Sequence, residues 1–372
     1  REMSAELFRP GGAYMFFSHT LNGQPSAMAM LRRMKELGCT LIDYERIIDE
    51  RGRQLVFFGR HAGLAGMIDT LCALGQRLKL EGHDTPFAHV KMAHQYADLH
   101  AARMAISRIG EELRDRRLPS MLRPMVFGFV GYGNVSKGAQ EIFDLLPHRE
   151  ITPPELLAGA AACDTGSDLL KVVFREEHTV RPKDEDSPFI LSHFFQHPNR
   201  YQSNFSRYLD HLSVLVNCIF WSPASPRLMT KADAARMWKN GRQPRLRVVG
   251  DLSCALCGGI EFTIAATDPD APVFVYEPEL DDIAYGVEGH GPVVMSVDSL
   301  PCELPAESSE EFSRALMPFM EKLATVDLNA PFEKSGLPAP LKRAVILWRG
   351  KLTPDYEFMH DCLRKAASGD SA

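Results

Sequence analysis

Apolar and polar positions alternate along the chain in two periods, one typical of strands and one typical of helices. The clearest unit covers residues 125–146, where a strand-like run (MVFGFV) leads into a glycine-rich turn and then into an amphipathic helix pattern. Strand, tight turn and helix in this order begin a βαβ unit of a parallel sheet. Other apolar runs of strand length cover residues 14–18, 39–44, 53–59, 148–151, 212–221, 246–251, 272–276 and 292–297.

Helical spacing of apolar residues separates several of these predicted strands. It predicts helices over residues 27–37, 67–78 and 92–113, and an amphipathic helix over residues 308–323 that begins with a capping serine followed by acids. The glycines of GRHAGLAG, residues 59–66, lack the spacing of a nucleotide-binding loop. We therefore assign those glycines to close helix packing.

Strands that alternate with helices predict an α/β fold with two Rossmann-like domains, parallel sheets and a cleft between the domains. Residues 158–188 and 190–204 read as an insertion of helices and polar loops, and residues 114–124 as the crossing between domains. The predicted division is a substrate domain over 1–124, incomplete at its N-terminal end, a dinucleotide-binding Rossmann domain over 125–306, and a return helix with the C-terminal part of the substrate domain over 307–372.

The glycine turn after residue 130 has the form G-x-G-x-x-x-x-G. Glycines allow a backbone to turn sharply and approach a pyrophosphate, and the N-terminus of the following helix attracts the anion. A plain turn before a helix would show the same glycines, but the strand before and the helix after favour dinucleotide binding. The residues assigned to the cofactor are Gly131, Gly133, Asn134, Val135 and Gly138.

Composition narrows the classes of function. The 372 residues are 45% hydrophobic and 24% charged, as in globular proteins, and a net charge of −6 gives no basic surface for nucleic acid. No apolar run approaches the roughly 18 residues that span a bilayer. Eight scattered cysteines indicate a reducing compartment, and the pair Cys254 and Cys257 lacks the partners of a metal site, so no metal is expected.

Polar side chains follow two predicted strands of the N-terminal region. His19 follows the strand at 14–18, and Glu45 follows the strand at 39–44. Because ligands bind at the carboxyl ends of parallel strands, we expect His19, Gln24 and Glu45 to be neighbours. A histidine suits proton transfer near neutral pH. The alternatives are a structural, hydrogen-bonded histidine and a solvated glutamate.

Cofactor preference depends on the second strand of the dinucleotide domain, predicted at residues 148–151. An acid at its end would bind the adenosine ribose and favour NAD, but Thr152 and two prolines occupy that place. His148 and Arg149 are close enough to be candidates for a 2′-phosphate. The sequence therefore favours NADP, with NAD as the alternative.

A series of motifs, in order along the chain, resembles the lysine-ketoglutarate reductase domain, the saccharopine-forming half of alpha-aminoadipic semialdehyde synthase. This resemblance implies a fold like that of alanine dehydrogenase and of lysine-forming saccharopine dehydrogenase. It also implies that L-lysine and 2-oxoglutarate condense to an imine, which NADPH reduces to saccharopine. The motifs are FFSHT (16–20), LIDYE (41–45), FFGRHAGLAGMID (57–69), TPFAHV (85–90), GYGNVSKGAQEIF (131–143), HPNRY (197–201), PRLMT (226–230), GGIEF (258–262) and SVDSLP (296–301).

The resemblance also implies roles for single residues. The histidine after FFS is an acid/base group in this family, so His19 would be catalytic, together with Glu45. Gln24 and Arg53 would contact substrate. A His–Glu pair can transfer protons, and a nearby Arg can bind one of the three carboxylates of the two substrates.

Two positions depart from the family pattern. Arg1 stands where the family has a lysine, and arginine stays charged and cannot shuttle protons as a lysine can. The family stretch D-x-S-x-D beside the nicotinamide keeps Asp251 and Ser253, which we assign to the cofactor, but has Ala255 as its last residue. The alternatives are therefore a catalytically weakened dinucleotide-binding domain, serving as the regulatory or scaffold half of a bifunctional lysine-catabolic enzyme, and an alanine-dehydrogenase-like enzyme.

Expected partners are L-lysine, 2-oxoglutarate, saccharopine and a fused saccharopine dehydrogenase domain, without nucleic acid or membrane. A homo-oligomer is expected, although the sequence carries no signal for oligomeric state. The chain begins with Arg1 and not with methionine, so we expect a fragment of a longer protein. The expected compartment is the cytoplasm or the mitochondrial matrix.

Overall fold

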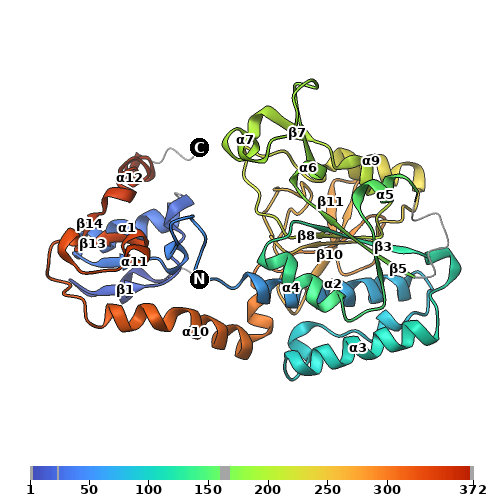
Figure 1. The fold of residues 1–372 in the computed structure, drawn as a ribbon, viewed down its shortest axis with the longest axis horizontal. Helices are drawn as coiled ribbons and strands as arrows, with labels where there is room; N and C mark the ends of the chain where they lie inside the picture. Colours follow the sequence, from blue (N-terminus) through green and yellow to red (C-terminus); the bar gives the residue numbers. More distant parts are fainter. Residues whose placement is uncertain (1–2, 23–24, 160–167, 369–372) are drawn as a thin grey trace. The chain divides into compact units, whose positions relative to one another are not determined.

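The computed structural model describes residues 3–22, 25–159 and 168–368 (Figure 1). The chain divides into two compact units. The larger unit is Phe58–Ser308, and the smaller unit joins Arg1–Phe57 to Ser309–Ala372. Both ends of the chain therefore belong to the smaller unit.

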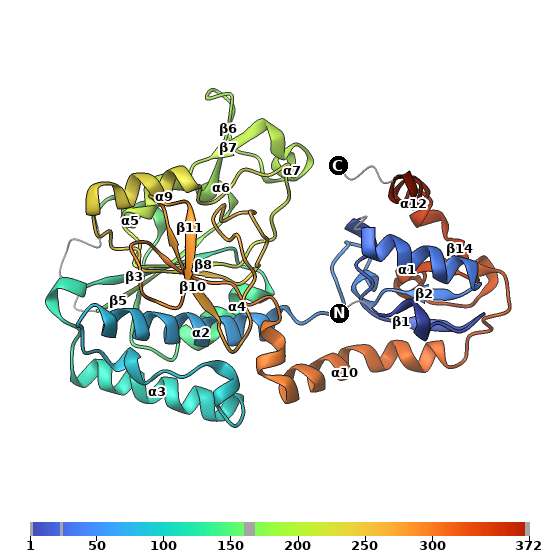
Figure 2. The same ribbon diagram turned by 180° about the vertical axis from the view of Figure 1, so that it is seen from behind.

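The larger unit is built on an eight-stranded sheet of order β11-β10-β12-β9-β8-β3-β5-β4 (Figure 2). All of its neighbouring strands are parallel except at one edge, where β10 runs antiparallel to both β12 and β11. All six residues of the internal strand β3 are buried, because helices cover both faces of a parallel sheet. The strands are β3 (Met125–Val130), β4 (Arg149–Glu150), β5 (Leu169–Phe174), β8 (Val214–Asn217), β9 (Val248–Asp251), β10 (Val273–Glu277), β11 (Asp282–Tyr285) and β12 (Val293–Met295).

Two apolar cores lie on the two faces of this sheet. One core joins α2 (Gly59–Leu80), α3 (Leu99–Asp115) and α4 (Asn134–Phe143) to residues such as Phe127 and Phe129 of β3. The other joins Val126 and Val130 of β3 to the helices of the opposite face. Shorter elements complete the unit: α5 (Pro153–Leu157), α6 (Glu176–Thr179), β6 (Val180–Pro182), α7 (Leu191–Gln196), β7 (Tyr201–Ser203), α8 (Ser206–Leu209) and α9 (Lys231–Trp238).

Helices α2 and α4 pack at very short range through glycines. A Cβ on Gly63 would lie 1.9 Å from the carbonyl oxygen of Val135, and a Cβ on Gly138 would lie 2.1 Å from the carbonyl oxygen of Arg60. Only glycine permits this separation, since ordinary contacts to a Cβ begin near 3.4 Å. The packing role predicted for the glycines of residues 59–66 is thus confirmed at Gly63.

Because of this packing, the first boundary between the units lies earlier in the chain than the sequence predicted. The units meet at residues 57/58 and 308/309, whereas the sequence predicted divisions after 124 and 306. Helices α2 and α3 belong to the larger unit because α2 covers one face of its sheet and contacts α4 closely. The proline-containing stretch before residue 125 is therefore a connection within the larger unit.

The smaller unit contains a four-stranded sheet of order β1-β2-β13-β14. Helix α1 (Pro25–Glu36) connects β1 and β2, which are parallel, as predicted. Strand β13 runs antiparallel to β2 and to β14, so this sheet is mixed and not parallel throughout. Its remaining elements are β1 (Ala13–Met15), β2 (Thr40–Ile42), α10 (Pro305–Leu323), α11 (Ala339–Ala344), β13 (Val345–Trp348), β14 (Lys351–Leu352) and α12 (Met359–Ser368).

The α/β fold class is confirmed, but three predicted elements differ. Residues 53–59 form no strand and contribute one isolated bridge, between Gln54 and Ile48. The predicted insertion over 158–188 contains β5, an internal strand of the sheet that pairs with β3 and with the edge strand β4. The helix predicted to start at residue 92 begins at Leu99, after a short 3₁₀ turn. In the described part of the chain, no helix has the length and apolarity that crossing a membrane requires.

Candidate functional site

The glycine turn lies between β3 and α4, and its glycines differ in their surroundings. Gly131 has a φ of +97°, which favours glycine, and a Cβ there would lie 2.7 Å from Cγ2 of Ile219. A Cβ on Gly133 would meet nothing within 4 Å, so the space before the helix is open. Gly133 is the residue before α4 and has no side chain to cap the first N–H groups of that helix. The turn therefore offers backbone donors to an anion.

A cavity of about 250 Å³ opens at the carboxyl ends of the same strands. Its lining comes from the ends of β3 and β5, from the segment after β8, and from α7. Most of the lining is apolar, and Phe195 and Phe220 are 64% and 91% exposed. Flat aromatic walls beside a glycine turn suit a planar ring such as a purine. The main lining residues are Val130, Gly131, Phe174, Arg175, Glu176, Phe194, Phe195, Ile219, Phe220, Trp221 and Arg227.

Strand register corrects the residues that the sequence offered for a 2′-phosphate. Strand β4 lies outside β5, and Arg149 pairs with Leu170, which pairs in turn with Val126. Val126 lies four residues before Val130, or about 13 Å along the strand at roughly 3.3 Å per residue. Arg149 therefore lies toward the edge of the sheet opposite the glycine turn.

Strand β5 pairs with β3 on the side opposite β8, and its end reaches the glycine turn. Phe174 pairs with Val130, so Arg175 and Glu176 follow β5 at the level of the turn. Both residues line the cavity. Sequence reasoning missed them because β5 was taken for part of an insertion. The apolar run LLKVVF was the signal that could have identified the strand.

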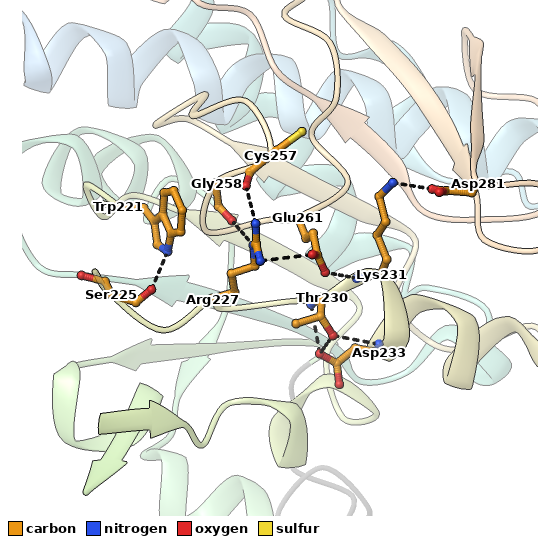
Figure 3. Close-up of polar contacts among 10 residues, drawn as sticks. All are labelled: Trp221, Ser225, Arg227, Thr230, Lys231, Asp233, Cys257, Gly258, Glu261 and Asp281. Atoms are coloured by element: carbon orange, nitrogen blue, oxygen red, sulfur yellow. Dashed lines mark hydrogen bonds and ion pairs between the residues drawn. The ribbon is translucent and has the colours of Figure 1, made fainter. Parts of the chain in front are cut away.

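Two sequence motifs, PRLMT and GGIEF, meet at Arg227, which also lines this cavity (Figure 3). The guanidinium of Arg227 donates to the carbonyl oxygens of Gly258 (3.3 Å) and Cys257 (3.1 Å) and pairs with Oε1 of Glu261 at 3.1 Å. Oε2 of Glu261 accepts from the backbone N–H of Lys231 at 2.9 Å. Arg227 thus ties the loop after β9 to the segment that follows β8.

Asp251, the last residue of β9, is buried, and both of its carboxylate oxygens already accept hydrogen bonds. Oδ1 accepts from the amide nitrogen of Asn217 at 2.9 Å, and Oδ2 accepts from the hydroxyl of Thr263 at 2.7 Å. Burial raises the pKa of Asp251 to about 6, and these hydrogen bonds oppose the rise. The Asp251 carboxylate therefore links the ends of β8 and β9. The cofactor contacts predicted for Asp251 and for the half-exposed Ser253 stay predictions.

In the smaller unit, Asp43 joins the loops that follow β1 and β2. Its Oδ2 accepts from the backbone N–H of Ser18 (3.0 Å) and from the Ser18 hydroxyl (2.6 Å), and its Oδ1 accepts from the backbone N–H of Glu45 (3.0 Å). Asp43 is 1% exposed. His19 follows Ser18 directly, so these bonds join the loops that carry His19 and Glu45, whereas the predicted proximity of the His19, Gln24 and Glu45 side chains stays a prediction. Asp43 itself was not among the predicted site residues, although the motif LIDYE contains it.

His19 has an unusual backbone conformation for a residue with a side chain. Its φ is +54°, and its ring centroid lies 3.9 Å from that of Phe17. Such a φ costs roughly 1–2 kcal/mol in a residue other than glycine. Strain of this kind is often found at functional positions, where the surrounding structure holds it.

Glu45 is half-buried beside the charge of Asp43. Burial is the main cause that raises the pKa of Glu45 to about 7; the Asp43 carboxylate adds to the rise and Arg46 opposes it. A carboxyl group with this pKa exchanges protons readily near neutral pH. The loop after β2 therefore carries a carboxyl group suited to proton transfer, and the role of His19 stays a prediction.

The other predicted substrate contacts are less defined. Gln24 lies outside the described residues, as does Arg1. Arg53 is exposed, and its Nε pairs with Oδ2 of Asp49 at 2.7 Å. Its contact with substrate stays a prediction. Among the residues that the structure describes, no group of three or more His, Cys, Asp or Glu is arranged to hold a metal ion.

A second acidic cluster lies inside the larger unit. Asp69 of α2 accepts from the backbone N–H of Ala93 at 2.8 Å, and Oε2 of Glu303 lies 3.1 Å from Nδ1 of His94. Burial, reinforced by the charge of Glu303, holds the pKa of Asp69 well above its usual range. Since the pKa of the buried Asp69 is raised, titration of this carboxyl group makes stability depend on pH.

Comparison with known proteins gives no matching family model, but it does give similar proteins. The alpha-aminoadipic semialdehyde synthase of Arabidopsis thaliana is 37% identical over 96% of this chain and 34% of its own length. The mitochondrial alpha-aminoadipic semialdehyde synthase of Bos taurus is 35% identical over 95% of this chain and 39% of its own. The NAD(+)-dependent, L-lysine-forming saccharopine dehydrogenase of Schizosaccharomyces pombe is 25% identical over 85% of this chain and 70% of its own.

This chain thus spans between a third and two fifths of the length of the synthases it matches. Among solved structures, an L-alanine dehydrogenase has a TM-score of 0.49 at 15% identity, covering 96% of this chain and 78% of its own. A transhydrogenase from Sinorhizobium meliloti has a TM-score of 0.48 at 14% identity, covering 94% and 77%.

Proposed function

We propose, from the premise that this chain is homologous to one domain of the alpha-aminoadipic semialdehyde synthases, that it is a lysine-ketoglutarate reductase. It condenses L-lysine with 2-oxoglutarate and reduces the resulting imine with NADPH to saccharopine. The observation that carries the proposal is the Asp43 link, because it holds the loops of His19 and Glu45 together after two parallel strands. Proton transfer in imine formation needs acid or base groups within reach of the reacting atoms, and loops joined in this way can present both groups to one substrate.

The residues of the glycine turn fit a nicotinamide dinucleotide. Gly131 makes the sharp turn, Gly133 leaves room for a pyrophosphate, and Gly138 lets α4 lie close to α2. The backbone N–H groups of Asn134 and Val135, in the first turn of α4, face the same open space in this proposal. The cofactor, when bound, supplies the hydride that reduces the imine.

Glu45 and His19 move the protons. Imine formation requires removal of a proton from the lysine ammonium and donation of protons to the departing water. With a pKa near 7, Glu45 is present in both protonation states at neutral pH and serves as acid or base. Gln24 and Arg53 complete the proposal as substrate contacts, Arg53 by attracting a substrate carboxylate.

The full-length protein tests this function directly. Oxidation of NADPH is followed at 340 nm with lysine and 2-oxoglutarate together and with each omitted, and saccharopine is identified by mass spectrometry. We expect oxidation only when both substrates are present. Binding of NADPH without oxidation that depends on lysine would refute the reductase and support the second candidate.

The second candidate is a catalytically weakened domain that binds the dinucleotide and regulates a larger enzyme. It is favoured by the loop after β9, where Asp251 is engaged in hydrogen bonds and Ala255 supplies no carboxylate. An Ala255→Asp variant separates the two, since a gain of turnover of tenfold or more would mark the native domain as weakened. An alanine-dehydrogenase-like activity would instead show reduction of NAD that depends on alanine.

The proposed compartment is the mitochondrial matrix. The synthases of Bos taurus and Mus musculus are named as mitochondrial proteins. Co-fractionation of the full-length protein with a matrix enzyme supports the assignment, and recovery with cytosolic markers refutes it.

A further inference from the structure

Strand β5 ends next to the glycine turn and is followed there by a cationic residue, Arg175. Because Phe174 pairs with Val130, Arg175 begins the loop beside Gly131 and lines the cavity. In nucleotide-binding sheets of strand order 3-2-1-4, strand 1 carries the glycine turn and the residue that contacts the adenosine ribose follows strand 2. In the order β4-β5-β3-β8, β5 has the place of strand 2. Arg175 therefore stands where the 2′-position of that ribose is recognised.

The guanidinium of Arg175 is held over an aromatic ring and remains available. Its Cζ lies 4.8 Å from the ring centroid of Tyr132, the residue between the two turn glycines. The backbone N–H of Arg175 donates to Nδ1 of His178 at 3.0 Å, which fixes the start of the loop. Arg175 is exposed and forms no ion pair with any residue in the described part of the chain. A stacked, unpaired guanidinium is well suited to bind a phosphate with two hydrogen bonds.

The neighbouring Glu176 acts in the opposite direction. Its Oε1 lies 3.5 Å from the hydroxyl of Tyr132, so the carboxylate is on the same side of the turn. A carboxylate there would accept from ribose hydroxyls and repel a 2′-phosphate. Glu176 lines the cavity as well, but its carboxylate contacts the Tyr132 hydroxyl and its side chain is partly buried, whereas Arg175 is exposed.

We propose that Arg175, stacked on Tyr132, binds the 2′-phosphate of NADPH and sets the preference of this chain for NADP over NAD. The inference rests on the proposed dinucleotide site but not on the lysine chemistry. The residue that selects the cofactor then lies at the end of β5, and not on β4 as the sequence analysis predicted. Arg149, on β4, then has no part in selection.

Binding measurements on the full-length protein test this. NADPH and NADH are titrated by their fluorescence, and adenosine 2′,5′-bisphosphate is compared with AMP as a competitor. For Arg175→Ala we expect the Kd of NADPH to rise about 10- to 100-fold, as for loss of a charge-assisted hydrogen bond pair, and that of NADH to change less than about threefold. Arg175→Lys should recover part of the loss, because it keeps the charge without the planar fork.

Arg149→Ala is the matched control, since it removes the same charge from the neighbouring strand and should leave both Kd values unchanged. Loss of selectivity in Arg149→Ala but not in Arg175→Ala overturns the inference. Equal weakening of NADPH and NADH in Arg175→Ala also overturns it, because Arg175 would then only shape the pocket. If the native protein binds neither dinucleotide, the proposed function fails as well. Selective NADPH binding without saccharopine synthesis leaves the role of Arg175 supported and refutes only the reductase.

Discussion

A pair of glycine substitutions separates the packing role from the ligand role within one turn. Gly138→Ala places a Cβ 2.1 Å from the carbonyl oxygen of Arg60, where α4 meets α2. Gly133→Val adds a larger side chain only a few residues away, at a position where a Cβ meets no atom within 4 Å. The first change should therefore disturb the fold, and the second should disturb only a ligand that approaches the turn.

The size of the first effect follows from the overlap. A Cβ in ordinary contact sits at 3.4 Å or more, so the two helices must separate by more than an ångström. Overpacking of this kind costs about 1–3 kcal/mol. At roughly 2–4 °C per kcal/mol for a unit of this size, the Tm of Gly138→Ala should fall by about 2–12 °C. Gly133→Val should stay within about 2 °C of the native Tm.

Thermal unfolding followed by circular dichroism measures the first quantity, and fluorescence titration with NADPH measures the second. We expect Gly133→Val to raise the Kd of NADPH at least about tenfold, because the valine occupies the approach of the pyrophosphate. A Gly138→Ala protein as stable as the native one would contradict the packing distance. Native affinity for NADPH in Gly133→Val would show that the dinucleotide does not bind at this turn.

Further outcomes concern the ionisable groups. His19→Ala in the full-length protein should lower kcat at least about 100-fold with the Kd of NADPH unchanged, and a loss under threefold would remove His19 from catalysis. Glu45→Gln should abolish the step in kcat near pH 7, since that step follows the carboxyl whose pKa is about 7; a retained step would assign it elsewhere. The raised pKa of Asp69 means that its protonated form stabilises the fold and that this contribution is lost as pH rises. Between pH 5.5 and 8.5, the Tm of Asp69→Asn should therefore fall less than the Tm of the native protein. Equal slopes of Tm against pH for the two proteins would refute this.

The hydrophobic periodicity of the sequence predicted those segments whose structure depends on residues close by in the chain. The strand, turn and helix over residues 125–143 appear as β3 and α4, and the unit of β1, α1 and β2 also follows its prediction. In both, the apolar period and the turn residues agree with the tertiary environment. The packing role of Gly63 was recognised in the same way, because its spacing did not fit a phosphate loop.

Strand pairing was the part that local pattern did not determine. Residues 53–59 have high strand propensity, but β13, about 300 residues later in the chain, occupies the edge of β2 where they could have paired. An apolar segment without a pairing partner cannot form a ladder. Conversely, residues 169–174 looked like part of an insertion and form β5, because the edge of β3 was open to them.

For the site, sequence determined the chemical groups, and tertiary structure decided which of them act together. His19, Glu45 and the glycines were identifiable because residue type and position after a strand depend on the chain alone. The link through Asp43, the pKa of Glu45 and the place of Arg175 were not, because hydrogen bonds, burial and strand order arise between residues far apart in the chain. Only the folded chain brings such residues within the few ångströms over which they change one another's chemistry.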